Sequence, residues 1–107
     1  MTWTVLLKVP VFVCLLGWIK AIQYTVTDSN IQLNCSYRAI NKEIIQWMKI
    51  GDSRTELSSN ALIFSNVGQE LRGRLNITGD HSSGEYNLMI SDIKKYDEGK
   101  YGCKVYG

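Results

Sequence analysis

The chain has 107 residues, enough for one small domain and too few for a second. Its 45% hydrophobic and 21% charged residues are ordinary for a globular protein and exclude a disordered chain. The 12 Lys and Arg residues against 10 Asp and Glu residues are scattered, so charge gives no reason to expect nucleic acid or an anionic membrane as a partner.

Residues 1–21 are predicted to be a secretory signal peptide. The apolar run at residues 9–19 is bounded by Lys8 and Lys20 and is shorter than the roughly 20 apolar residues that span a bilayer. Ala21 is the expected last residue of the signal, which starts the mature chain at Ile22, and Gly17 is a rival cleavage point. The alternatives are a buried first strand or a short membrane anchor.

Cleavage changes the charge and the cysteine count. Without Lys8 and Lys20, the 12 basic residues become 10, equal to the 10 acidic ones. Cys14 leaves with the signal, so of the 3 cysteines one pair remains, in a chain bound for the oxidising secretory pathway. We therefore expect an extracellular or cell-surface protein.

The mature chain alternates predicted strands and turns. Residues 23–27 form a short first strand, and residues 28–30 turn. In residues 31–37 the side chains of Ile31, Leu33, Cys35 and Tyr37 point one way, with the period of two of a half-buried strand. Residues 39–43 are a polar loop. Residues 44–50, centred on Trp47, form the next strand.

Five further segments complete the predicted strands. After a turn at residues 51–52, short strands are expected at residues 56–57 and 62–64. Residues 72–78 and 86–90 each form a strand, joined by a turn at 81–84, and residues 94–96 form a corner before the last strand. The inward side chains of these strands are Leu75, Ile77, Leu88, Ile90, Tyr101, Cys103 and Val105.

The last strand opens with the pattern D-x-G-x-Y-x-C, formed by Asp97, Gly99, Tyr101 and Cys103. Together with Cys35 and Trp47 upstream, this set resembles the V-type immunoglobulin domain. The resemblance covers residues 24–107. It implies an all-β, two-sheet Greek-key sandwich that occupies residues 22–107 and lacks its last strand, G, which would lie beyond Gly107 together with any membrane span.

The same resemblance implies a disulfide between Cys35 and Cys103, with Trp47 packed against it. In the chain-entropy model, closing this loop of 68 residues stabilises the fold by roughly 4 kcal/mol. The core is then expected to contain Trp47, Tyr101, Leu33, Leu88 and Ile90. Two free buried thiols are the alternative, which would suit a cytosolic protein.

The stretch from Gly73 to Ile90 resembles V-type domains of cell-surface adhesion and immune receptors, such as the coxsackie-and-adenovirus-receptor and junctional-adhesion groups. In that family an arginine at the start of strand D pairs with the aspartate of the last-strand motif. Arg74 and Asp97 hold those positions, and Arg72 is a rival partner.

Two glycosylation sequons are present, at Asn34 and Asn76, and Asn76 is favoured because Cys35 beside Asn34 must form the disulfide. His81 lies in a polar turn, where consecutive residues cannot form a catalytic triad. One histidine without free thiols or clustered carboxylates makes a poor metal site. We expect no enzyme activity, no metal and no cofactor.

One sheet face is the predicted partner-binding site. If Trp47 and Cys103 point inward, alternation turns six neighbours outward: Gln46, Met48, Ile50, Lys100, Lys104 and Tyr106. Exposed apolar and aromatic groups with a charged rim are typical of an interface. The alternative is that the C′ loop, which follows residues 44–50, or the missing strand G covers them.

The sequence thus favours a protein-binding domain of an adhesion or immune-type receptor, whose first candidate partner is a like immunoglobulin domain. The alternatives are a soluble humoral factor that binds carbohydrate or a microbial surface, and a structural spacer in a multi-domain adhesion protein. Fold alone does not choose among them.

Overall fold

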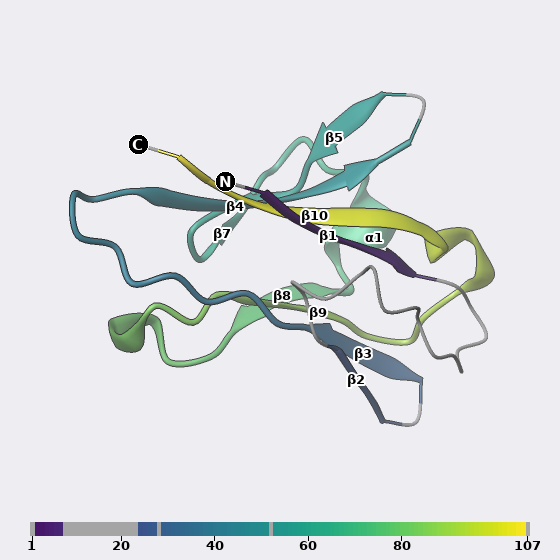
Figure 1. The fold of residues 1–107 in the computed structure, drawn as a ribbon. Coiled ribbons are helices and arrows are strands. Elements are labelled where there is room, and N and C mark those ends of the chain that lie inside the picture. Colours follow the sequence, from purple (N-terminus) through teal and green to yellow (C-terminus); the bar gives the residue numbers. More distant parts are fainter. Residues whose placement is uncertain (1, 8–23, 28, 52, 107) are drawn as a thin grey trace.

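The computed structural model describes residues 2–7, 24–27, 29–51 and 53–106. The predicted signal peptide lies largely outside these ranges. The described residues form two antiparallel four-stranded sheets that pack face to face, as Figure 1 shows. The two-sheet all-β sandwich expected from the sequence is confirmed.

One sheet, in the order β1-β10-β4-β5, is built around the strand that carries the D-x-G-x-Y-x-C motif. Its strands are β1 (Thr2–Leu7), β4 (Ile44–Ile50), β5 (Arg54–Glu56) and β10 (Gly99–Tyr106). The register places Cys103 opposite Trp47 and Gly102 opposite Met48. The second sheet, in the order β2-β3-β9-β8, contains β2 (Tyr24–Thr27), β3 (Asn30–Leu33), β8 (Leu75–Thr78) and β9 (Asn87–Ile90).

Short elements join the sheets. They are the hairpin of β6 (Ser58–Ser59) and β7 (Leu62–Ile63), the helix α1 (Gln69–Arg72), and the 3-10 turns η1 (His81–Ser83) and η2 (Lys95–Asp97). The strand predicted over residues 72–78 is therefore too long at its start, because Arg72 ends α1 and Gly73 caps it. Gly73 has helical backbone angles (φ −69°, ψ −12°), and its N–H donates to the Gln69 carbonyl at 3.1 Å, so the helical turn extends to this residue and delays the strand.

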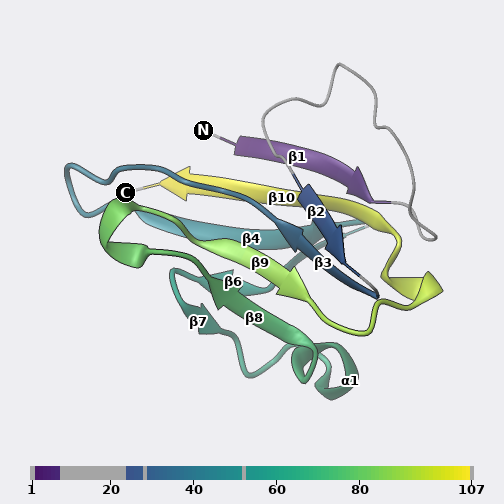
Figure 2. The same cartoon turned by 90° about the horizontal axis from the view of Figure 1, so that it is seen from below.

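The edge of β10 is occupied in an unexpected way. Residues 2–7 were expected to belong to the signal peptide, with a buried first strand as one alternative. In the structure β1 pairs antiparallel with β10 from Thr2 opposite Lys104 to Leu7 opposite Gly99. This is the edge on which a strand following β10 was expected (Figure 2). An open strand edge presents unpaired N–H and C=O groups, so an extended segment that reaches it gains a full ladder of hydrogen bonds.

The core lies between the sheets and follows the predicted alternation. The expected core residues Leu33, Trp47, Leu88, Ile90 and Tyr101 are all fully buried. Cys35 and Cys103 are joined by a disulfide, with their Cα atoms 6.5 Å apart. Trp47 packs in this cluster and donates its indole N–H to the carbonyl of Tyr86 at 2.8 Å, so its polar atom is satisfied inside the sandwich.

Candidate functional site

The outer face of β4 and β10 does not expose the apolar side chains that were predicted to anchor a partner. Met48 is 1% exposed and Gln46 is 4% exposed. The expectation that these two residues are open to a partner is wrong. Strand alternation fixes the side of a sheet on which a residue lies, but not what else covers that side.

The remaining predicted residues of this face are accessible. Ile50 and Lys104 are half-buried, Lys100 is exposed and Tyr106 is 37% exposed. The Lys104 ammonium lies 5.3 Å from the centroid of the Tyr106 ring, within the range of a cation–π contact. We call Ile50, Lys100, Lys104 and Tyr106 the β10 face. It is a basic surface with one aromatic end.

Acidic groups do not offset this charge on β10. Among the residues the structure describes, Lys100 and Lys104 have no acidic partner. Along the sheet, Glu56 on β5 is 3.8 Å from Arg54, so its charge is matched locally. The β10 face therefore carries excess positive charge toward the solvent.

Beside the Arg54–Glu56 pair lies an open hollow of about 460 Å³. It is lined by Arg54, Thr55, Glu56, Phe64 and Asn66.

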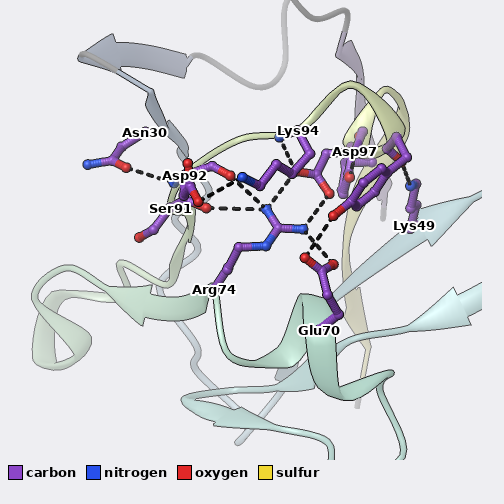
Figure 3. A network of polar contacts seen from close by, with 10 residues as sticks. Asn30, Lys49, Glu70, Arg74, Ser91, Asp92, Lys94 and Asp97 are labelled. Atoms are coloured by element: carbon purple, nitrogen blue, oxygen red, sulfur yellow. Dashed lines mark hydrogen bonds and ion pairs between the residues drawn. The ribbon is translucent and has the colours of Figure 1, made fainter.

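The end of the sandwich that contains α1 and η2 is closed by an ion pair, which Figure 3 shows. Arg74 donates from Nη1 to Asp97 Oδ2 at 2.7 Å and from Nη2 to Asp97 Oδ1 at 2.9 Å. Nη2 also reaches Glu70 at 3.2 Å, and Nη1 reaches the carbonyls of Ser91 and Asp92. Arg74, the partner expected from the family motif, makes the pair with Asp97, whereas Arg72 ends α1 as an exposed residue.

This pairing sets the charge states of the network. Burial raises the pKa of Asp97, but the hydrogen bonds from Arg74 and from the Lys94 amide outweigh burial, so the pKa lies below its ordinary value. The same carboxylate raises the pKa of Arg74. The Tyr96 hydroxyl, followed by Arg74, lowers the pKa of Glu70. All three side chains are charged at neutral pH.

Tyr101 connects the network to the core. Its hydroxyl donates to the carbonyl of Asp97 at 2.6 Å, and its ring is fully buried. Burial raises the pKa of the Tyr101 hydroxyl, so this group remains a proton donor. This bond, together with the ion pair, fixes the turn that precedes β10 and hence the position of the β10 face.

The two sequons lie at the second sheet, Asn76 within β8 and Asn34 directly after β3. Asn76, on β8, is exposed between the buried Leu75 and Ile77. Asn34 is half-buried, and its Oδ1 accepts a hydrogen bond from Gln32 at 3.1 Å. A glycan on Asn76 would leave the β10 face, on the other sheet, uncovered.

The chemistry of the described residues offers little for catalysis. They contain no group of three or more His, Cys, Asp or Glu side chains that could hold a metal ion. His81 stacks on Tyr86 with ring centroids 4.6 Å apart, and its Nδ1 lies 2.8 Å from the Glu85 carbonyl. Within the same residues, no helix has the length and apolar character needed to cross a membrane.

Sequence reasoning missed a second accessible region at the end of the sandwich away from the ion pair. Figure 1 places there the loop between β3 and β4, the η1 turn and the end of β10. In that loop Ile40 is 77% exposed, and Leu62 on β7 is 65% exposed. The signal in the sequence was Ile40 itself. An isoleucine in a polar surface loop is not buried in the core, and an exposed apolar side chain can mark a binding surface.

The comparisons with known proteins agree with this architecture. The immunoglobulin I-set domain family matches residues 20–107. Mouse junctional adhesion molecule-like protein is 29% identical over 97 residues, which cover 81% of this chain and 25% of the relative. Human CXADR-like membrane protein is 28% identical over 108 residues, which cover 94% of this chain and 29% of the relative.

The chain thus spans about a quarter to three tenths of the length of these relatives. No solved structure matches it. The family match covers the disulfide, Trp47, the Arg74–Asp97 pair and the β10 face, that is, nearly every feature described above. The chain belongs to the immunoglobulin I-set domain family.

Proposed function

We propose that this chain is the protein-binding domain of an extracellular adhesion-type receptor and that it binds through the β10 face. The similarity to two adhesion-type proteins supports the class of function. The observation that carries the site is the cationic pair of exposed Lys100 and half-buried Lys104, with the Lys104 ammonium beside the Tyr106 ring. Aromatic residues are enriched where proteins meet, and charged side chains at the rim of an interface steer a partner of opposite charge.

The charge of this face selects its partner. A symmetric pair of identical domains would place each β10 face against its own copy, which brings lysines against lysines. Like charges across an interface disfavour association, whereas an acidic surface is attracted. We therefore propose that the partner is a related domain with an acidic face rather than a second copy of this chain.

The V-type arrangement remains part of this proposal. Its support is the β6–β7 hairpin, which adds short strands between β5 and β8, in the region where the variable type has its two extra strands.

Charge reversal on β10 tests the function. Lys100→Glu is expected to weaken partner binding at least tenfold, mainly by slowing association, while Lys95→Glu on η2 leaves binding unchanged. Both lysines are exposed, so neither change should disturb folding. The readout is surface plasmon resonance against candidate adhesion ectodomains, with sedimentation of the chain alone to detect self-association. Equal binding by both variants, or a dimer that Lys100→Glu leaves intact, would refute the β10 face as the site.

A further inference from the structure

The end of the sandwich away from the Arg74–Asp97 pair contains a cavity that the proposed function does not use. Its volume is about 180 Å³, and its lining includes Tyr37, Arg38, Glu43, Asn60, His81 and Tyr86. These residues come from the loop before β4, the β6–β7 turn and the segment around η1, which Figure 2 shows gathered at one end. Pockets for drug-sized ligands have volumes of about 300–1,000 Å³, so this cavity suits a smaller ligand.

The walls of the cavity are held in place by backbone contacts. Tyr37 donates its N–H to the Gly84 carbonyl at 3.0 Å, and Ser36 forms a bridge with Glu85. Gly84 has φ of 90°, and a Cβ at this position would collide with the Tyr37 carbonyl. Only glycine allows the η1 turn to approach the loop so closely. The cavity is therefore preorganised.

The third wall is fixed by Asn60, which has φ of 51° at the β6–β7 turn. Its N–H donates to the Ile45 carbonyl at 2.7 Å, and its Oδ1 accepts from the Ile45 N–H at 3.0 Å. The Oδ1 atom thus takes the place of a backbone carbonyl in the pairing of Asn60 with Ile45. Its Nδ2, for which the described residues provide no acceptor, remains a donor at the cavity.

Both hydrogen-bond donors and hydrogen-bond acceptors line the cavity. Arg38 is exposed, and no acidic or carbonyl partner for its guanidinium occurs among the described residues. Because the Glu85 carbonyl can only accept, His81 Nδ1 carries the proton, and in the neutral ring Nε2 is an acceptor. Glu43 accepts from the Ile40 and Asn41 amides at 3.0 and 2.8 Å and still has lone pairs free.

The charges of the cavity cancel. The amide of Asn41, together with that of Ile40 and the Tyr37 hydroxyl, lowers the pKa of Glu43, so this carboxylate is ionised at neutral pH. Its negative charge opposes the positive charge of Arg38 in the same cavity. A ligand that carries a net charge would gain from one of these groups and lose to the other. The cavity therefore favours a neutral ligand that both donates and accepts hydrogen bonds.

The rings of His81 and Tyr86 both line the cavity and lie one over the other, with an angle of 5° between their planes. The outer face of such a stack is a flat apolar surface. A pyranose ring has one face of C–H groups and a rim of hydroxyls, so it can pack on such a surface while its rim meets Arg38, Asn60 and Glu43. We propose that this cavity binds a neutral hexose unit, such as the terminal sugar of a glycan on another molecule.

The test is an NMR titration of the ¹⁵N-labelled chain, as secreted, with methyl galactoside, methyl mannoside and N-acetylglucosamine. At least one sugar is expected to shift the amides of residues 37–43 and 81–86. Arg38→Ala should weaken that binding about tenfold, as the loss of one hydrogen bond to a charged group implies. The matched control is Arg72→Ala, an exposed arginine at the other end of the sandwich, which should bind as wild type.

Four outcomes would overturn the proposal. They are the absence of shifts with all three sugars, shifts that map to another surface, unchanged binding by Arg38→Ala, and equal shifts by sodium acetate, which would make the cavity a carboxylate site. Arg38 is exposed, so its replacement should leave the thermal midpoint unchanged. None of these results bears on the separate proposal that the β10 face binds a protein partner.

Discussion

Arg74 and Asp97 form a bidentate ion pair that joins the start of β8 to the turn before β10, with N–O distances of 2.7 and 2.9 Å. The Asp97 side chain is 2% exposed and that of Arg74 is 12% exposed, so the pair is largely shielded from water. Two parallel hydrogen bonds between planar groups also fix the relative orientation of the two segments.

Removal of the arginine should destabilise the fold strongly. Arg74→Ala leaves the Asp97 carboxylate buried without its cation, which should lower the free energy of unfolding by about 3 kcal/mol. Arg72→Ala is the matched control and should cost less than about 0.5 kcal/mol, because this residue is exposed. Urea unfolding followed by tryptophan fluorescence measures both. Equal losses for the two variants would show that the pair contributes little to stability.

The stability of the domain should fall in acid because of Asp97. Its folded pKa lies below the unfolded value of about 3.9, so the stability it supplies is present above that value. It is lost as pH falls through the folded pKa. Asp97→Asn should flatten the stability curve below about pH 4, relative to wild type, in denaturant titrations across pH. An acid loss of the same size in both proteins would assign the effect to other carboxylates.

The Tyr101 hydroxyl should be worth more than that of Tyr96. Tyr101→Phe removes a buried 2.6 Å bond to the Asp97 carbonyl and should cost about 1–2 kcal/mol. Tyr96→Phe removes a 2.8 Å bond to Glu70 at a residue that is 62% exposed, where water replaces the partner. Its cost should be near zero in the same unfolding assay. A larger loss for Tyr96→Phe would contradict this ranking.

Glycosylation is expected at Asn76 and not at Asn34. Asn76 is exposed on β8, whereas Asn34 is half-buried, bonded to Gln32 and adjacent to the disulfide. In secreted protein, Asn76→Gln should abolish the mobility shift that peptide N-glycosidase produces on a gel, and Asn34→Gln should preserve it. A shift that disappears only with Asn34→Gln would reverse the assignment.

Residues 1–21 are expected to be removed during secretion, which exposes Ile22 as the mature N-terminus. This cleavage would also remove β1 and leave the edge of β10 open for pairing with another strand. N-terminal sequencing of secreted protein measures the outcome. A mature chain that begins at Met1 would make the segment an anchor or a permanent first strand.

The sequence by itself determined the elements whose signal is local or periodic. The alternation of Ile31, Leu33 and Cys35, and of Tyr101, Cys103 and Val105, predicted strands with the buried faces observed. The resemblance of the Cys35, Trp47 and D-x-G-x-Y-x-C set to an immunoglobulin domain implied the sandwich, and the same resemblance favoured Arg74 over Arg72 as the partner of Asp97. These signals are reliable because a shift of one residue would expose an entire buried face.

Only the tertiary structure decided which outward residues are accessible and which distant residues meet. Met48 and Lys100 are both outward by alternation, yet Met48 is buried and Lys100 is exposed, and alternation along a strand does not distinguish the two. The cavity brings together Arg38, Asn60 and His81 from three separate turns. No periodicity in the chain encodes that proximity, since it depends on how the loops fold over the end of the sandwich.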